Sequence, residues 1–226
     1  MTRLGGAIDA LAASRVFKPL VFLACAMPAI FLALRAYHAF ALGDQLALGV
    51  DPVKTLEHET GIAALAILMF TLSVTPLRRL LHANRLQRVR RMLGVGSFTY
   101  ALLHLGMYLV FDQSCYSIGS CEFRAIWQDI LKRPFIFMGM LAFSILLALA
   151  ITSTNGWVRR LKRNWQRLHR LVYVAGTAAV IHFIWIQKSD FRVPIRYGFW
   201  LIVLLLIRVG LSIQKRRGRV VKAVTA

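Results

Sequence analysis

Cysteines are scarce in this sequence, and so are the motifs that depend on them. The chain has three, Cys25, Cys115 and Cys121, with neither CxxC nor CxxCH spacing. Three cysteines are too few for a disulfide framework, and the missing motifs give no support to a zinc site or to covalently attached c-type haem. No GxGxxG motif is present either, so a nucleotide-binding domain for NADPH is not expected.

Acidic residues are also rare. Nine Asp and Glu stand against 29 Lys and Arg, while charged residues make up only 17% of the chain and hydrophobic residues 58%. A soluble domain seldom combines such values. The basic residues fall in short clusters between long apolar runs, and the aromatic residues lie within those runs. This pattern is typical of membrane topology, so we expect membrane lipid and no nucleic acid among the partners.

Six apolar segments are long enough to cross a bilayer, which requires roughly 20 helical residues. The sequence therefore predicts an all-α integral membrane bundle of six transmembrane helices, forming a single domain over residues 1–226. No internal repeat is visible. Pro28 lies inside the first segment and predicts a kink there. The six predicted segments are 19–40, 58–77, 93–111, 134–153, 168–187 and 196–214.

The distribution of basic residues predicts the orientation of the chain. Most Lys and Arg fall before the first segment, after the last, and in the loops that follow the second and fourth segments. The positive-inside rule then places both termini in the cytoplasm. The longest loops on the other side, about 41–57 and 112–133, are the candidates for contact with an external partner.

Two histidines inside the predicted spans carry the main functional hypothesis, because an imidazole in hydrocarbon is costly unless its nitrogens are used. His104 lies in the third segment and His182 in the fifth, and both segments rise from a basic cluster. At about 1.5 Å per residue the two reach nearly the same depth. A b-type haem with two axial imidazoles requires this arrangement. The alternative is a pair of core histidines that hydrogen-bond to carbonyls or serines.

Two further histidines are candidate ligands. His169 precedes His182 by about 20 Å along an ideal helix, which suits a second redox centre, but the two rings would point about 140° apart. Gly176 between them would allow a distortion and leave room for a macrocycle, or would only permit close helix packing. His58 begins the second segment beside Glu57 and Glu59. Three roles stay open for it: an iron ligand, a docking group or a solvated side chain.

Eight short stretches, in their order and spacing, resemble one known family: the haem-binding membrane subunits of bacterial protein-methionine-sulfoxide reductase, MsrQ, within the ferric-reductase-like transmembrane superfamily. The resemblance covers nearly the whole chain. The stretches are Asp51–Lys54 with His58–Gly61, Thr75–Leu77, Arg90–Gly94, Leu103–Leu105, Arg133–Pro134, Thr152–Thr154, Trp165–His169 with Val172–Tyr173, and Ile181–Phe183 with Trp185.

The resemblance implies a cytochrome b in the bacterial inner membrane, an electron-transfer subunit without substrate chemistry of its own. It would take electrons from the quinone pool or a cytoplasmic flavin reductase. It would pass them to a periplasmic, molybdopterin-containing methionine sulfoxide reductase catalytic subunit that repairs oxidised proteins. The implied cofactors are one or two haems b, with FMN in some members, and the implied haem ligands fall on His104, His169 and His182.

The sequence departs from the wider superfamily at two places. Arg91 stands where related oxidases have the second inner-haem histidine, and a guanidinium is a poor iron ligand. Arg91 would instead pair with a haem propionate or a flavin phosphate. The loop from Cys115 to Cys121 is not part of the family pattern, and in an oxidising periplasm the two cysteines would form a disulfide or, alternatively, a redox relay.

Two other functions stay open at this point. One is a quinol-oxidising cytochrome b that anchors a different redox partner. The other is a transporter or scaffold without redox chemistry, although transporters usually show paired broken helices and inverted repeats, which the sequence does not display.

Overall fold

The computed structural model describes residues 3–44, 46–115 and 121–224, and within these ranges it contains helices and no strand. Six helical stretches are long and apolar enough to cross a membrane, which confirms the predicted fold class and a multi-pass membrane protein. Their main helices are α2 (Phe17–Ala41), α3 (Pro52–Leu80), α4 (Gln87–Met107), α6 (Pro134–Ile151), α9 (Val172–Ile186) and α10 (Arg192–Val224).

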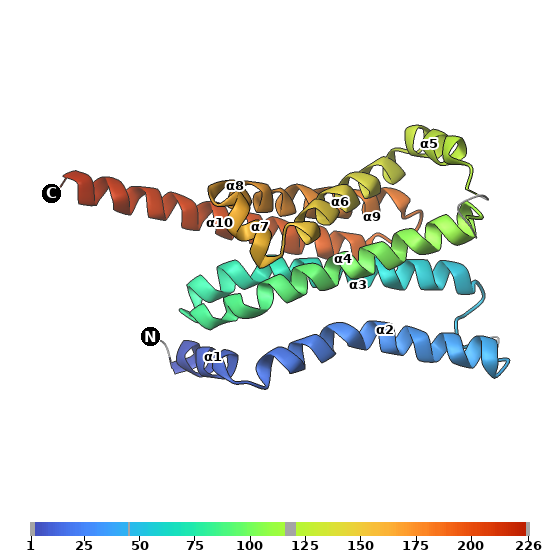
Figure 1. Ribbon diagram of the computed structural model, residues 1–226, viewed down its shortest axis with the longest axis horizontal. Coiled ribbons are helices and arrows are strands. Elements are labelled where there is room, and N and C mark those ends of the chain that lie inside the picture. Colours follow the sequence, from blue (N-terminus) through green and yellow to red (C-terminus); the bar gives the residue numbers. More distant parts are fainter. Residues whose placement is uncertain (1–2, 45, 116–120, 225–226) are drawn as a thin grey trace.

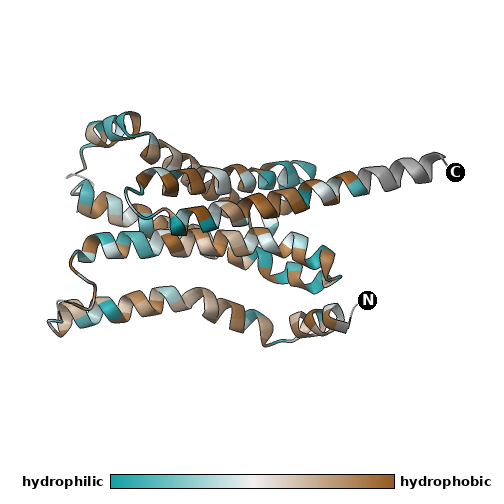
Figure 2. Cartoon of the chain, turned by 180° about the vertical axis from the view of Figure 1, so that it is seen from behind, coloured by the Kyte–Doolittle hydropathy of each residue, from teal (hydrophilic) through white to brown (hydrophobic). Residues whose placement is uncertain are grey.

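The helices run roughly parallel to one long axis, with both chain termini at the same end (Figure 1). We call this the terminal end, and the opposite end the far end. Hydrophobic residues fill the middle of the spans and hydrophilic ones gather near their ends (Figure 2). Met69 of α3 and Ala175 of α9 are fully buried in the main core cluster. The bundle centre is therefore formed by α3 and α9, with α4, α6 and α10 packed around them.

The predicted boundaries need correction at several helices. The second helix begins at Pro52, so His58 lies within α3 instead of starting it. This earlier start has a local cause, because Pro52 occupies the first turn and the Asp51 side chain accepts a hydrogen bond from the Lys54 N–H at 3.0 Å. Hydrogen bonds from Lys54 also lower the pKa of the exposed Asp51 carboxyl. Pro76, expected at the end of the helix, lies inside it.

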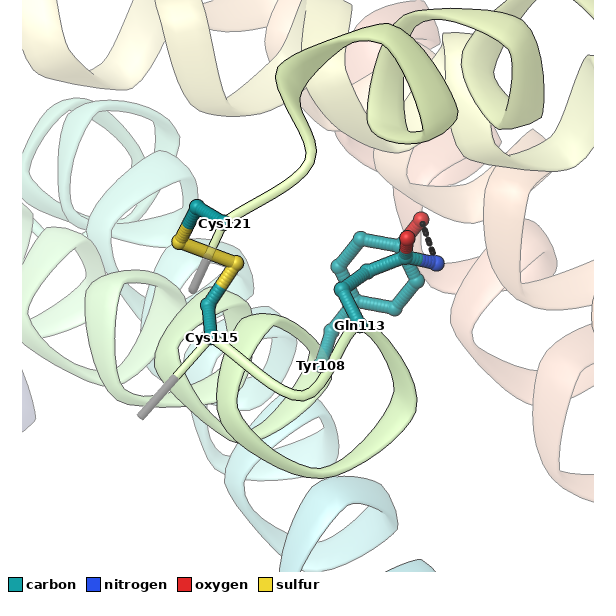
Figure 3. The surroundings of a disulfide bond; sticks show 4 residues. All are labelled: Tyr108, Gln113, Cys115 and Cys121. Atoms are coloured by element: carbon teal, nitrogen blue, oxygen red, sulfur yellow. Dashed lines mark hydrogen bonds between the residues drawn. A yellow bond between two sulfur atoms is a disulfide. The ribbon is translucent and has the colours of Figure 1, made fainter. Parts of the chain in front are cut away.

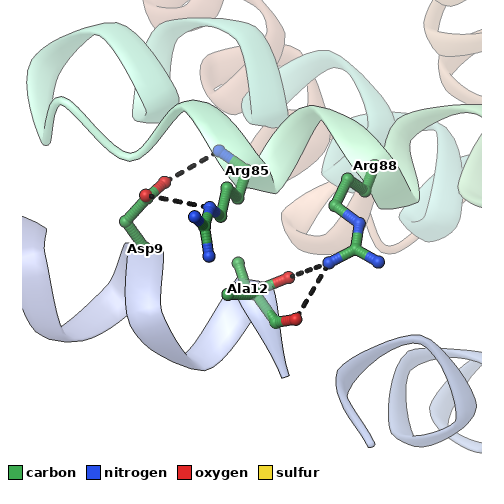
Figure 4. Close-up of polar contacts among 5 residues, drawn as sticks. Asp9, Ala12, Arg85 and Arg88 are labelled. Atoms are coloured by element: carbon green, nitrogen blue, oxygen red, sulfur yellow. Dashed lines mark hydrogen bonds and ion pairs between the residues drawn. The ribbon is translucent and has the colours of Figure 1, made fainter. Parts of the chain in front are cut away.

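Short helices replace three stretches that the sequence suggested as loops or tails: α1 (Arg3–Ala13), α5 (Phe123–Lys132) and the pair α7 (Asn155–Leu161) and α8 (Arg163–Leu168). Helix α1 is bound to the 3-10 helix η1 (Asn84–Leu86) and to the start of α4 (Figure 4). Asp9 accepts a hydrogen bond from the Arg85 N–H at 2.8 Å, and Arg88 donates to the carbonyls of Ala12 and Ala13. These bonds fix α1 against the terminal end of the bundle.

The far end carries α5 and a short disulfide loop (Figure 3). Cys115 and Cys121 form a disulfide, while the residues between them, 116–120, lie outside the described ranges. Beside it, the Tyr108 hydroxyl donates to Asp129 of α5 at 2.9 Å, and Gln113 donates to the Tyr108 oxygen at 3.0 Å. These bonds tie the π-helical extension of α4, η2 (Tyr108–Asp112), to α5. Within the loop expected at 112–133, the described residues on both sides of 116–120 are therefore braced by these bonds.

Helix α2 is bent along its length (Figure 1), and Pro28, where the sequence predicts a kink, lies inside it. Tyr100 of α4 explains how the bend is stabilised. Its hydroxyl accepts a hydrogen bond from the Ala29 N–H at 2.9 Å and donates to the Cys25 carbonyl at 2.7 Å. These two backbone groups would bond to each other in a regular helix, so the hydroxyl is inserted into the α2 ladder.

We expect Tyr100→Phe to destabilise the protein by about 1–3 kcal/mol, because it leaves two half-buried backbone groups without their bridging partner. Thermal unfolding in detergent, followed by the loss of helical circular dichroism, measures the change. Tyr37→Phe is the control, since Tyr37 is 58% exposed on the same helix α2. Equal unfolding midpoints for the Tyr100→Phe and Tyr37→Phe variants would show that the inserted hydroxyl contributes nothing.

Candidate functional site

His104 and His182 lie next to each other in the interior of the bundle. His104 lies in the last turn of α4 and His182 near the end of α9. Their ring centres are 6.1 Å apart and their planes meet at 78°. The prediction that the two imidazoles lie at one level is therefore confirmed by their direct juxtaposition.

Each of these rings is fixed by a backbone carbonyl from a neighbouring helix. The Nδ1 of His104 lies 2.8 Å from the Glu57 carbonyl of α3, and the Nδ1 of His182 lies 2.7 Å from the Phe135 carbonyl of α6. A carbonyl only accepts, so Nδ1 carries the proton in both rings. The neutral tautomer then leaves the Nε2 lone pair of each imidazole available, which is the state of a metal-ligating histidine with an oriented second nitrogen.

Two glycines make room for the rings. A Cβ atom on Gly61 of α3 would lie 3.1 Å from Nδ1 of His104, and one on Gly139 of α6 would lie 2.9 Å from Nδ1 of His182. Each glycine follows its carbonyl-bearing residue by one helical turn, in the same helix. Any larger residue at Gly139 would have to displace the imidazole, so the two glycines shape the site as much as the histidines do.

The two half-sites are copies of one arrangement. In each, the carbonyl lies 47 residues before the histidine that binds it, and the glycine follows four residues after the carbonyl. Helices α3 and α4 thus form one pair, and α6 and α9 form the other. Few other residues match between the two helix pairs, so the constant spacing between Gly and His is the one sign of this duplication in the sequence.

The spacing of the pair fits a metal ion held between the rings. A metal–imidazole bond is about 2.0–2.1 Å long and the ring centre lies roughly 1.1 Å from Nε2, so two imidazoles on one iron have centres about 6 Å apart. The observed 6.1 Å agrees with this value. The alternative reading, core histidines satisfied by carbonyls, accounts for both Nδ1 atoms but not for the adjacent rings and their glycine pockets.

His169 lies away from this pair, at the terminal end. It begins a 3-10 turn, η4 (His169–Leu171), between α8 and α9, and its ring stacks on Trp165 at 3.9 Å. Its Nδ1 lies 3.2 Å from the Trp165 carbonyl, while its buried Nε2 has no hydrogen-bond partner, although the Leu149 carbonyl lies nearby. No second imidazole faces it among the described residues.

The sequence suggested a helix irregularity between His169 and His182, at Gly176. The irregularity in the structure is instead the 3-10 turn at His169–Leu171, and Gly176 lies inside the α-helix α9. Gly176 is buried, and a Cβ atom there would lie 3.4 Å from Leu72 of α3 and 3.6 Å from Leu201 of α10. Of the two explanations for this glycine, the structure supports close helix packing.

The other two candidate residues lie outside the histidine pair. His58 is exposed, and its ring lies 5.9 Å from that of Phe183. Arg91 is exposed at the terminal end, where its guanidinium donates to the Asn155 side chain at 2.6 Å. Its neighbour Arg90 is turned about 100° further around α4 and is half-buried. Of these two adjacent arginines, the sequence pointed to the exposed Arg91, and it is Arg90 that reaches into the bundle.

Comparison with known proteins agrees with this geometry. Residues 60–180 match the family described as the ferric reductase like transmembrane component. The haem-binding subunit MsrQ of protein-methionine-sulfoxide reductase from Xanthomonas oryzae pv. oryzae (strain MAFF 311018) is 45% identical over 202 residues, 89% of each chain. The chain belongs to the MsrQ family. The MsrQ subunit from Xanthomonas campestris pv. campestris (strain B100) is 48% identical over 76% of each chain. The MsrQ subunit from Herminiimonas arsenicoxydans is 44% identical over 89% of this chain and 88% of its own.

The ferric-reductase match includes His104 and His169 but ends two residues before His182. The longer MsrQ alignments cover most of the chain. The juxtaposition of His104 and His182, with ring centres 6.1 Å apart, is therefore an observation of the structure that the superfamily match alone does not contain.

Proposed function

We propose that this chain is a membrane electron-transfer subunit that binds haem b between His104 and His182 and serves a methionine sulfoxide reductase. The single observation that carries the proposal is the pair of adjacent imidazoles, 6.1 Å apart, each with its Nδ1 fixed by a carbonyl. When bound, such a haem supplies one-electron transfer by cycling its iron between the ferric and ferrous states.

The residues around the pair perform three tasks in this proposal. The Glu57 and Phe135 carbonyls orient the rings and make each Nε2 a stronger donor. Gly61 and Gly139 admit the rings close to the helix backbone. The apolar helices keep water away from the ligands, and low solvent access is one of the factors that set a haem potential.

The partner and the direction of transfer belong to the same proposal. The relatives are named as haem-binding subunits of protein-methionine-sulfoxide reductase, which supports a methionine sulfoxide reductase catalytic subunit as partner. We place this periplasmic, molybdopterin-containing protein at the far end, near α5 and the Cys115–Cys121 disulfide, because the histidine pair lies close to that end. Both termini would then be cytoplasmic, with quinol or a flavin reductase as donor.

One haem is sufficient for this proposal. His169 offers one unpartnered imidazole nitrogen at the terminal end, and the described part of the chain places no second imidazole opposite it. A second haem at His169 would need a sixth ligand from elsewhere, or would bind through one imidazole only.

The optical spectrum of the purified full chain tests the proposal. We expect the spectrum of a low-spin b-type haem, with a sharp visible band on reduction by dithionite, and about one haem per chain. Mixing the reduced protein with its purified catalytic partner and methionine sulfoxide should then reoxidise it. A protein that carries no haem after expression with ample haem precursor would favour the scaffold or transporter alternative.

A further inference from the structure

Three half-buried arginines from three helices come together at the terminal end. They are Arg78 of α3, Arg90 of α4 and Arg208 of α10. Arg208 lies over the ring of Tyr173 of α9, with its guanidinium carbon 4.2 Å from the ring centre. Arg90 is within Coulombic range of Arg78, Arg208 and Tyr173, and also of His169. We call these five residues the arginine cluster.

No ion pair among the described residues supplies a negative charge to this cluster. Only one of the nine acidic residues, Asp9, falls in a segment at the terminal end. Asp9 is bonded to Arg85. None of the ion pairs between described residues includes Arg78, Arg90 or Arg208. Three cations held together without a counter-charge repel one another, so an anion at this place stabilises the fold.

Unused polar atoms lie at the same place. The structure has three buried side-chain nitrogen or oxygen atoms without a hydrogen-bond partner among the described residues: Thr75 Oγ1, Arg78 Nε and His169 Nε2. Thr75 lies one turn before Arg78 on α3. Thr71 and Thr152 elsewhere in the bundle donate to the carbonyl four residues back, whereas Thr75 does not. The Leu149 carbonyl lies near His169, but Thr75 Oγ1 and Arg78 Nε, one turn apart on α3, have no such neighbour among the described residues. Buried polar groups are normally paired, so these two unpaired atoms indicate a missing ligand.

We propose that the arginine cluster, with Thr75, binds a phosphate group at the membrane interface. A phosphate presents several charged acceptor oxygens, which suits guanidinium donors that converge from different helices, and Arg matches it through two parallel N–H bonds. Basic pockets between transmembrane helices on the cytoplasmic side recognise lipid headgroups by this chemistry. The phosphate has two possible sources: an anionic phospholipid of the membrane, or a soluble phosphate monoester such as FMN.

Variants with a matched control separate this site from general surface charge. Arg78→Gln removes a half-buried cluster member, and Arg79→Gln removes the same charge from the next residue, which is exposed. Arg90→Gln and Arg208→Gln test the other two arginines. Arg78→Lys keeps the charge without the planar fork, so it should bind more weakly than wild type and more tightly than Arg78→Gln. Where Arg78→Gln fails to fold, the Arg78→Lys comparison still decides.

The probes distinguish the two sources. The full-length protein in neutral detergent is titrated with phosphatidylglycerol, phosphatidylcholine, FMN or inorganic phosphate, and bound ligand is counted by native mass spectrometry. We expect Arg78→Gln and Arg90→Gln to weaken binding roughly tenfold or more, and Arg79→Gln to change it less than about twofold. Preference for phosphatidylglycerol over phosphatidylcholine identifies a lipid site, and binding of FMN or phosphate identifies a soluble ligand.

Two results would overturn the proposal. One is equal binding of phosphatidylglycerol and phosphatidylcholine together with no binding of FMN or phosphate. The other is an equal loss of binding in Arg78→Gln and Arg79→Gln. Neither result depends on haem, since haem content is read separately from the optical spectrum of the same samples.

Discussion

Replacing His182 with alanine is expected to remove the b-type haem from the purified protein. In the proposed site the change removes one of the two imidazoles that would hold the haem and leaves only His104. The ring of His182 is surrounded by the Phe135 carbonyl and by Gly139, and neither of these residues brings a side chain that could replace the imidazole as a ligand. Haem per chain, measured by the pyridine haemochrome assay, should fall at least about tenfold, and His104→Ala should give the same result.

His38→Ala provides the control for this experiment. His38 is an exposed histidine near the end of α2 and takes no part in the pair. Its replacement should leave haem content and the reduced spectrum unchanged. Wild-type haem content and an unshifted spectrum in both His104→Ala and His182→Ala would disprove the axial assignment, while helical content by circular dichroism confirms that each variant is folded.

Gly139→Ala is expected to have nearly as large an effect, although it changes no ligand. The added methyl group would lie 2.9 Å from Nδ1 and 3.0 Å from Cε1 of His182, and real Cβ atoms do not approach this closely. The ring must move, which breaks its bond to the Phe135 carbonyl and misdirects Nε2. Loss of an outer-shell partner of a metal ligand typically costs 10–100-fold in affinity, so haem retention during dialysis against apomyoglobin should fall by about that factor.

Gly106→Ala is the matched control for Gly139→Ala. Gly106 lies two residues after His104 in the same helix, and a Cβ atom there meets nothing within 4 Å. Both changes raise helix propensity by up to about 1 kcal/mol, so a difference between them reports the contact with the histidine. If Gly139→Ala retained haem as well as Gly106→Ala does, the glycine pocket would have no role in holding the ring.

The sequence predicted those features that depend on counting along a single helix. Hydropathy located all six spans, and depth alone placed His104 and His182 opposite each other. The Phe135 carbonyl was not predictable, since a backbone acceptor has no side-chain signature and its partner lies on another helix. Arg91 was preferred to Arg90 from its spacing to His104, whereas the direction of each arginine depends on how α4 is rotated within the bundle.

The short helices were missed for a different reason. In α5, the exposed residues Phe123, Trp127 and Leu131 follow one another at intervals of four, which is the pattern of an amphipathic helix. A membrane span takes about twenty apolar residues, so hydropathy over that length does not reveal the ten-residue helix α5. A search for shorter periodic segments would have detected α5, and α1 by the same test.

Because each helix pair contributes one imidazole and one carbonyl, neither half of the bundle can hold a bis-imidazole group alone. Any group bound at both histidines joins α4 to α9 across the seam between the halves. A ligand that binds the folded chain and not the unfolded one raises stability by mass action. The cofactor would therefore also stabilise the packing of the two halves against each other. Association of the two halves would in turn favour haem binding.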